Sequence, residues 1–145
     1  MIGKLTRVAV TLGAATGMAV VATPGAASAA NNGYAWACWK APDDTINGGC
    51  AKLYANGEIL RLEDFQADGW GTRAQIQKFL PDGNGVKRWV NHGDPCFDDT
   101  STSNTNGGMT VCDYNTAENI PIRVHVWASR NGVYKHHNYS PSIQS

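Results

Sequence analysis

The sequence has no excess of charge of either sign, and it has no long apolar run after its first 29 residues. It contains 12 basic and 12 acidic residues, and setting aside Lys4 and Arg7 leaves ten basic residues against twelve acidic ones. Without a basic stripe, neither a nucleic-acid ligand nor an electrostatic dock on a membrane surface is expected. No membrane-spanning segment is predicted beyond residue 29.

Recognisable catalytic motifs are also missing. The chain has no GxSxG elbow, no HExxH pair, no phosphate-binding loop and no dinucleotide fingerprint. His136 and His137 are adjacent, so on a strand they point to opposite faces and cannot both serve one metal, while His125 and His136 could meet across a hairpin. A pair of histidines on an exposed strand does not predict a metal site. We therefore expect no enzyme activity, no cofactor and no metal.

The first 29 residues are predicted to be a secretory signal peptide. A short basic start is followed by an apolar run over residues 8–21, which glycine and threonine interrupt, and then by Ala27-Ser28-Ala29. These are the small residues that a signal peptidase requires, and a membrane anchor would carry a longer unbroken run. The prediction is a secreted, extracellular protein with one domain over residues 30–145, since 116 residues are too few for two.

Four cysteines lie in that domain, and an even number in a small exported chain predicts two disulfides. Of the three possible pairings, Cys38 with Cys50 and Cys96 with Cys112 each close a short loop across one strand-to-strand connection. Zinc ligation would require CxxC-type clusters, and these spacings lack them. The paired arrangement leaves no free thiol for a cysteine nucleophile.

The rest of the domain predicts an all-β fold, an antiparallel β-sandwich or barrel of about seven or eight short strands. The clearest signal is a closing hairpin, in which Ile122, Val124 and Val126 alternate with polar residues and Asn131-Gly132 supplies the turn. No helix is expected, and residues 92–109 and 140–145 are predicted to be a mobile loop and a loose tail. The predicted strands cover residues 34–39, 50–55, 58–65, 72–80, 86–91, 110–114, 120–127 and 133–139.

Five tryptophans are more than a small core needs. We expect Trp36, Trp89 and Trp127 to pack in the core or against a disulfide. Trp70 is flanked by glycines in a turn, and Trp39 lies on the opposite face of its strand from Trp36. An exposed indole at either position would suit a sugar face or a protein-binding hot spot.

The first strand offers a mechanism for partner binding. It is almost apolar and begins within a few residues of the predicted free end, so it could pair with a partner's backbone or dock in a partner's groove. The alternative is an ordinary first strand held by Cys38. The candidate partner-binding residues are Tyr34, Trp36, Trp39 and Trp70.

Several stretches resemble a group of small secreted actinobacterial β-sandwich proteins. They are Tyr54-Ala55-Asn56-Gly57-Glu58, the segment from Ala67 to Ala74 (ADGWGTRA), Ile122-Arg123-Val124 and Asn131-Gly132. Some of these proteins are similar to the small adaptor subunit of umbrella toxin particles, which links a large stalked toxin subunit to a lectin. The resemblance implies that the partners are other secreted proteins.

Together these observations predict a secreted, non-enzymatic protein-interaction domain, with an adaptor role in a toxin complex as its specific form. One alternative is a carbohydrate-binding module in which Trp70 and Trp39 stack on a glycan. The other is a small secreted inhibitor or hydrolase.

Overall fold

A computed structural model describes residues 33–99 and 108–145. The predicted signal peptide and the middle of the predicted Cys96–Cys112 loop lie outside these ranges. In the described residues, strands are the main element, with one short 3-10 turn at Asn56–Glu58. The strands are β1 (Tyr34–Trp39), β2 (Gly49–Tyr54), β3 (Ile59–Asp64), β4 (Gly71–Pro81), β5 (Lys87–Asp98), β6 (Thr110–Asp113), β7 (Pro121–Arg130), β8 (Val133–Tyr139) and β9 (Ile143–Gln144).

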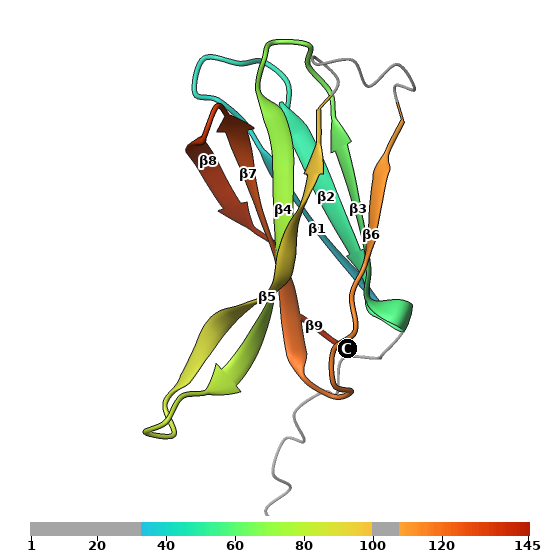
Figure 1. The fold of residues 1–145 in the computed structure, drawn as a ribbon, viewed down its shortest axis with the longest axis vertical. Coiled ribbons are helices and arrows are strands. Elements are labelled where there is room, and N and C mark those ends of the chain that lie inside the picture. Colours follow the sequence, from blue (N-terminus) through green and yellow to red (C-terminus); the bar gives the residue numbers. More distant parts are fainter. Residues whose placement is uncertain (1–32, 100–107) are drawn as a thin grey trace, which may run out of the picture.

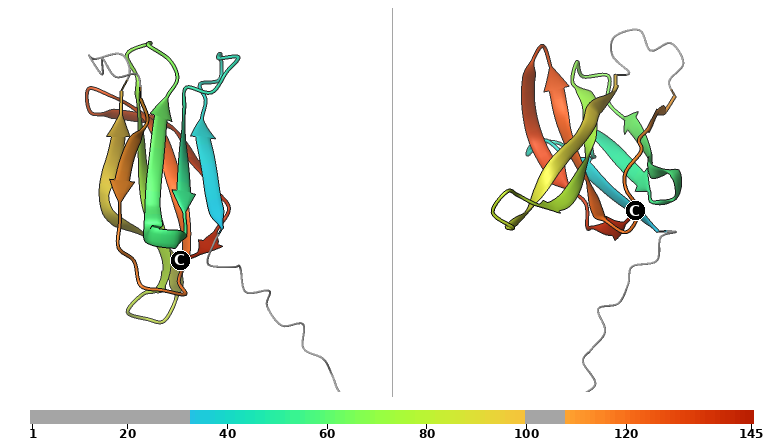
Figure 2. Two further views of the ribbon diagram at one scale, coloured as in Figure 1. Left: turned by 90° about the vertical axis from the view of Figure 1, so that its right-hand side faces the viewer. Right: turned by 60° about the horizontal axis from the view of Figure 1, so that its bottom comes forward.

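These strands form two antiparallel sheets packed face to face, which confirms the predicted sandwich (Figure 1). The four-stranded sheet has the order β1-β2-β3-β6, and the five-stranded sheet has the order β5-β4-β7-β8 with β9 paired to β7. The right-hand view of Figure 2 shows β7 and β8 on one side and β2 and β3 on the other. The far ends of β4 and β5 extend beyond the sandwich as a hairpin arm, on which Phe79 and Trp89 pack at 5.0 Å between ring centroids.

The core lies between the sheets and follows from the period of two in each strand. On β7 the predicted inward row of Ile122, Val124 and Val126 is fully buried. Asn131 and Gly132 both have positive φ, at 49° and 78°, which confirms the predicted tight turn. The core residues are Ala37, Trp39, Ala51, Leu53, Leu60, Leu62, Ala74, Ile76, Cys96, Ile122, Val124, Val126 and Ala128.

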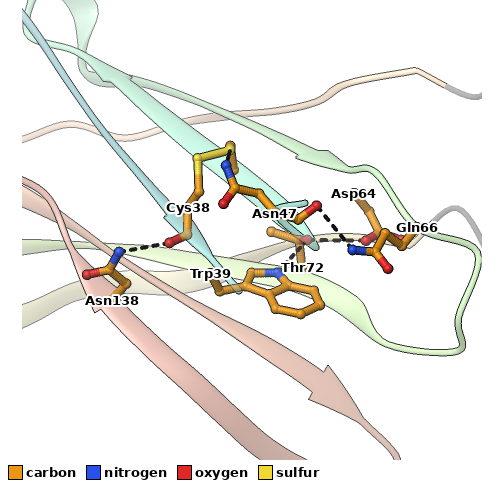
Figure 3. Close-up of a disulfide and its surroundings, with 8 residues drawn as sticks. Cys38, Trp39, Asn47, Asp64, Gln66, Thr72 and Asn138 are labelled. Atoms are coloured by element: carbon orange, nitrogen blue, oxygen red, sulfur yellow. Dashed lines mark hydrogen bonds between the residues drawn. A yellow bond between two sulfur atoms is a disulfide. The ribbon is translucent and has the colours of Figure 1, made fainter. Parts of the chain in front are cut away.

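Both predicted disulfides are present; one lies within a sheet and the other joins the two sheets. Cys38–Cys50 joins the neighbouring strands β1 and β2, while Cys96–Cys112 joins β5 of one sheet to β6 of the other. At the opposite side of the sandwich, the Asn138 side chain on β8 donates to the Cys38 carbonyl at 2.8 Å (Figure 3). The two sheets are thus connected along both lateral edges. Disulfides of this kind indicate an oxidising environment.

Parts of two segments predicted to be irregular, residues 92–98 and 143–144, are strands, and for these parts the prediction is wrong. β5 continues to Asp98, because it is an edge strand: Pro95 is tolerated there, and Gly93, at φ 68°, lies where the pairing with β4 shifts register. β9 lies in the predicted loose tail, where Ile143 pairs with Ile122 of β7. No helix in the described part of the chain is long and apolar enough to cross a membrane.

Candidate interaction surfaces

Strand β1 carries two opposite rows of side chains. Ala35, Ala37 and Trp39 point into the core, whereas Tyr34 and Trp36 point outward and are 56% and 57% exposed. The two small alanines allow β1 to lie close to β7 and β8 of the other sheet. The expectation that Trp36 packs in the core is therefore wrong, and its indole is part of the outer surface.

Trp39 is 1% exposed, so the expectation of an exposed indole at this position is wrong. Its indole N–H donates to Thr72 Oγ1 at 2.9 Å, and that hydroxyl lies 3.4 Å from Asp64 Oδ1 (Figure 3). Asp98, equally buried, accepts from the Asp64 backbone N–H at 2.8 Å and from the Thr110 hydroxyl at 2.6 Å. These two buried carboxylates connect β3, β4, β5 and β6 through hydrogen bonds, so their role is structural.

The outward side chains of β1 border a groove on the four-stranded sheet, here called the β1 groove, with a volume of about 420 Å³. The Lys52 ammonium lies 3.9 Å from the centroid of the Tyr34 ring and 5.0 Å from that of Tyr54. The Arg61 guanidinium, on the neighbouring strand β3, lies 5.0 Å from the centroid of the same Tyr54 ring. The groove thus combines large exposed rings with two cations. Its main lining residues are Tyr34, Trp36, Lys52, Tyr54, Arg61 and Glu63.

β1 is also an edge strand, and its register decides which backbone groups face outward. Cys38 and Cys50 are opposite each other with their Cα atoms 4.0 Å apart, the short spacing of a pair that exchanges no backbone hydrogen bonds. Pairs of this kind alternate along the two strands, so Trp36 and Tyr34 also exchange no backbone hydrogen bonds with the residues opposite them on β2. The N–H and C=O groups of these two residues therefore point away from β2, on the edge where the Cys38 carbonyl is bonded to Asn138 of β8.

Trp70 lies apart from the β1 groove. It is half-buried in the segment before β4, where it packs against the core. Its ring faces the β7–β8 hairpin, with the Lys135 ammonium 5.5 Å and the Arg130 guanidinium 6.0 Å from its centroid. The structure thus brings Tyr34 and Trp36 together and leaves Trp70 and Trp39 out of that set.

A second surface, which the sequence analysis did not identify, covers the outer face of the five-stranded sheet. There the Arg123 guanidinium lies between two rings, 4.2 Å from the centroid of Trp89 and 4.4 Å from that of Tyr139. Tyr139 in turn stacks on His125 at 4.5 Å, and His125 lies 4.5 Å from Trp127. We call this set the arginine–aromatic row; its members are Trp89, Arg123, Tyr139, His125, His137 and Trp127.

The histidines of this row are paired differently from the expectation. His125 Nε2 lies 2.9 Å from Nδ1 of His137, and His136 instead stacks on Trp39. The register between β7 and β8 shifts after Val126, and His136 has a φ of 55°. This bulge moves His137 to the outer face beside His125, and no sequence pattern marked it.

The pKa of His125 is lowered from 6.5 to about 4, because the ring is partly removed from water and lies beside His137 and Arg123. The unfolded chain takes up the proton first as the pH falls, so the stability contributed by the neutral ring is complete above pH 6.5 and is lost toward about pH 4. For a half-exposed ring, we expect this loss to be about 1 kcal/mol.

Urea unfolding of the wild type and of His125→Phe at about pH 7.5 and about pH 4.5 measures this effect. The free energy of unfolding should fall less in the variant, because its aromatic ring cannot take up a proton. An equal fall in both proteins would contradict the assignment to His125.

The described residues contain no group of three or more histidine, cysteine, aspartate or glutamate side chains placed to hold a metal ion. The candidate sites are two contact surfaces: the β1 groove with the edge of β1 on one sheet, and the arginine–aromatic row on the other. Comparisons with protein families, with curated proteins and with solved structures give no match for this chain.

Proposed function

We propose that this chain is a secreted, non-enzymatic interaction domain that binds a partner protein along the outer face and open edge of β1. The observation that carries the proposal is the coincidence at Tyr34 and Trp36 of an exposed ring with outward-pointing backbone groups. A partner strand could pair with the backbone while its side chains contact the rings, which is β-strand addition. Exposed Tyr and Trp are also the residue types that dominate binding hot spots.

Export is part of this proposal. It is supported by the predicted signal peptide and by two disulfides, which persist in oxidising compartments. The resemblance to the umbrella toxin adaptor suggests the kind of partner, namely another secreted protein such as a large toxin subunit or a lectin. The glycan alternative loses Trp39, which is buried, and Trp70 offers only a half-buried ring.

Native purification from the culture supernatant of the producing organism tests the proposal. The tagged wild type should elute in a stoichiometric complex, whereas a Tyr34→Ala/Trp36→Ala double variant should elute alone, because both ring contacts are lost. Phe65→Ala removes another exposed ring, 46% exposed and outside the β1 groove, and should leave the complex intact. A wild type that elutes only as a monomer, or a double variant that keeps its partner, would contradict the proposal.

A further inference from the structure

The near-neutral composition conceals a separation of charge between the two sheets. The strands of the five-stranded sheet carry seven Lys or Arg residues against two aspartates, and those of the four-stranded sheet carry two against three acidic residues. One of the two aspartates, Asp98, is buried and hydrogen-bonded, so it adds little to the outer surface. The basic residues of the five-stranded sheet are Arg73, Lys78, Lys87, Arg88, Arg123, Arg130 and Lys135. Lys78 and Lys135 are opposite the inward-facing Ile122 and Ala128, and Arg130 lies beside Trp70, so the charge of the outer face comes chiefly from Arg73 and Arg123.

Two of these cations are held on the outer face in the same way. Arg123 donates its Nε–H to Gln77 Oε1 at 2.9 Å and lies against rings on both sides. Arg73 donates its Nε–H to Ser129 Oγ at 2.9 Å, and its guanidinium lies 4.3 Å from the centroid of the Phe97 ring. In both cases a neutral side chain and an aromatic ring fix the guanidinium and leave its terminal nitrogens for another acceptor.

Within the described residues, neither of these guanidinium groups forms an ion pair. The salt bridge found there joins Arg88 to Asp82 at the end of the hairpin arm, at 2.9 Å. Two ordered cations without a carboxylate partner favour an anionic ligand, because a fixed guanidinium recognises a carboxylate with two parallel hydrogen bonds. The charge and geometry of this face are therefore complementary to an acidic surface.

The aromatic rings indicate which kind of acidic surface. Tyr139 stacks on His125 with 12° between the planes and has the Arg123 guanidinium 4.4 Å from its centroid, and the plane of Trp127 lies at 21° to that of His137. Ring faces that are engaged with neighbours are not available to stack on sugar rings. Trp, Tyr and Arg packed together are instead the composition of a protein-binding hot spot.

We propose that the outer face of the five-stranded sheet is a second docking surface, which binds an acidic protein partner through carboxylates that pair with Arg73 and Arg123. In the register, Arg73 is opposite Trp127 and Gln77 is opposite Arg123, so the two arginines are four residues apart along paired strands. That separation is about 13 Å at 3.3 Å per residue, and the partner must present carboxylates at a similar spacing. This surface lies on the opposite sheet from the β1 groove, so the chain could hold two partners at once.

Fluorescence anisotropy with a labelled ten-residue peptide rich in glutamate tests this surface, with the matching glutamine peptide as reference. At about 50 mM salt, where screening is weak, the wild type should bind the glutamate peptide and not the glutamine peptide. The double variant Arg73→Gln/Arg123→Gln should bind it at least about fivefold more weakly, since both charged hydrogen bonds are removed.

Lys52→Gln/Arg61→Gln is the matched control, because it removes the same charge from the four-stranded sheet and should leave peptide binding unchanged. Equal weakening in both double variants, or no preference for the glutamate peptide, would overturn the proposal. Tighter Arg73- and Arg123-dependent binding to chondroitin sulfate or to phosphatidylglycerol vesicles would also overturn the proposal of a protein partner. Trp36→Ala should not affect peptide binding, so this test can fail independently of the β1 groove.

Discussion

Replacing Cys96 and Cys112 by alanine is expected to lower the free energy of unfolding by about 4 kcal/mol. Chain entropy accounts for about 3 kcal/mol, because the disulfide constrains the unfolded chain across a separation of 16 residues. The remaining ~1 kcal/mol comes from the core, since Cys96 is only 2% exposed and the bond joins the edges of two sheets. Guanidinium-induced unfolding of the variant and the wild type under oxidising conditions measures the difference.

Cys38→Ala/Cys50→Ala is the control, with a comparable separation of 12 residues. Its entropic contribution is also about 3 kcal/mol, but it joins strands that backbone hydrogen bonds already hold together. We therefore expect a smaller loss, with the four-stranded sheet still assembled. A larger loss from this pair than from Cys96 and Cys112 would contradict the role assigned to the connection between the sheets.

Trp39→Ala is expected to destabilise the protein by about 3–5 kcal/mol, the usual result of removing a buried indole. The ring fills the space beside Gly48, where an added Cβ would overlap a carbon of the Trp39 ring. Its N–H is hydrogen-bonded to Thr72, so the substitution also leaves a buried hydroxyl without its donor. Thermal and urea unfolding measure the loss.

Trp36→Ala is the matched control on the same strand, and it should change the free energy of unfolding by less than about 0.5 kcal/mol because the ring is already exposed. Trp39→Ala should therefore lower the free energy of unfolding, whereas Trp36→Ala should weaken partner binding and leave that free energy almost unchanged. A comparable loss of stability in both would mean that the two faces of β1 are not distinguished as described.

Most of the sandwich could be predicted from the sequence because its signals are local. The β7–β8 hairpin has a clear alternation and an Asn131-Gly132 turn, and the disulfide pairing follows from short cysteine separations. The sequence predicts a strand that ends at residue 91, because the polar segment that follows has little to bury. β5 instead continues to Asp98, since Gly93 and Pro95 are tolerable at the edge of the sheet.

The surfaces were harder to predict. Alternation on β1 separates Trp36 from Trp39 but does not say which of them faces the core, since both rows contain aromatic rings. The outer face of the five-stranded sheet depends on register: Arg123 meets Trp89 and Tyr139 from two other strands, and a bulge brings His137 beside His125. Net charge also hides the unequal distribution of Lys and Arg between the two sheets, because it sums the residues of both.

Site-specific photo-crosslinking at position 36 tests the central claim most directly. A benzophenone amino acid replaces Trp36 in one variant and Phe65 in another, both in the full chain expressed by the producing organism. The account predicts that irradiation of the culture supernatant links position 36 to one secreted protein in high yield, and that position 65 gives no such product. Equal yields at the two positions, or no product from position 36, would show that β1 is an ordinary edge strand with no partner.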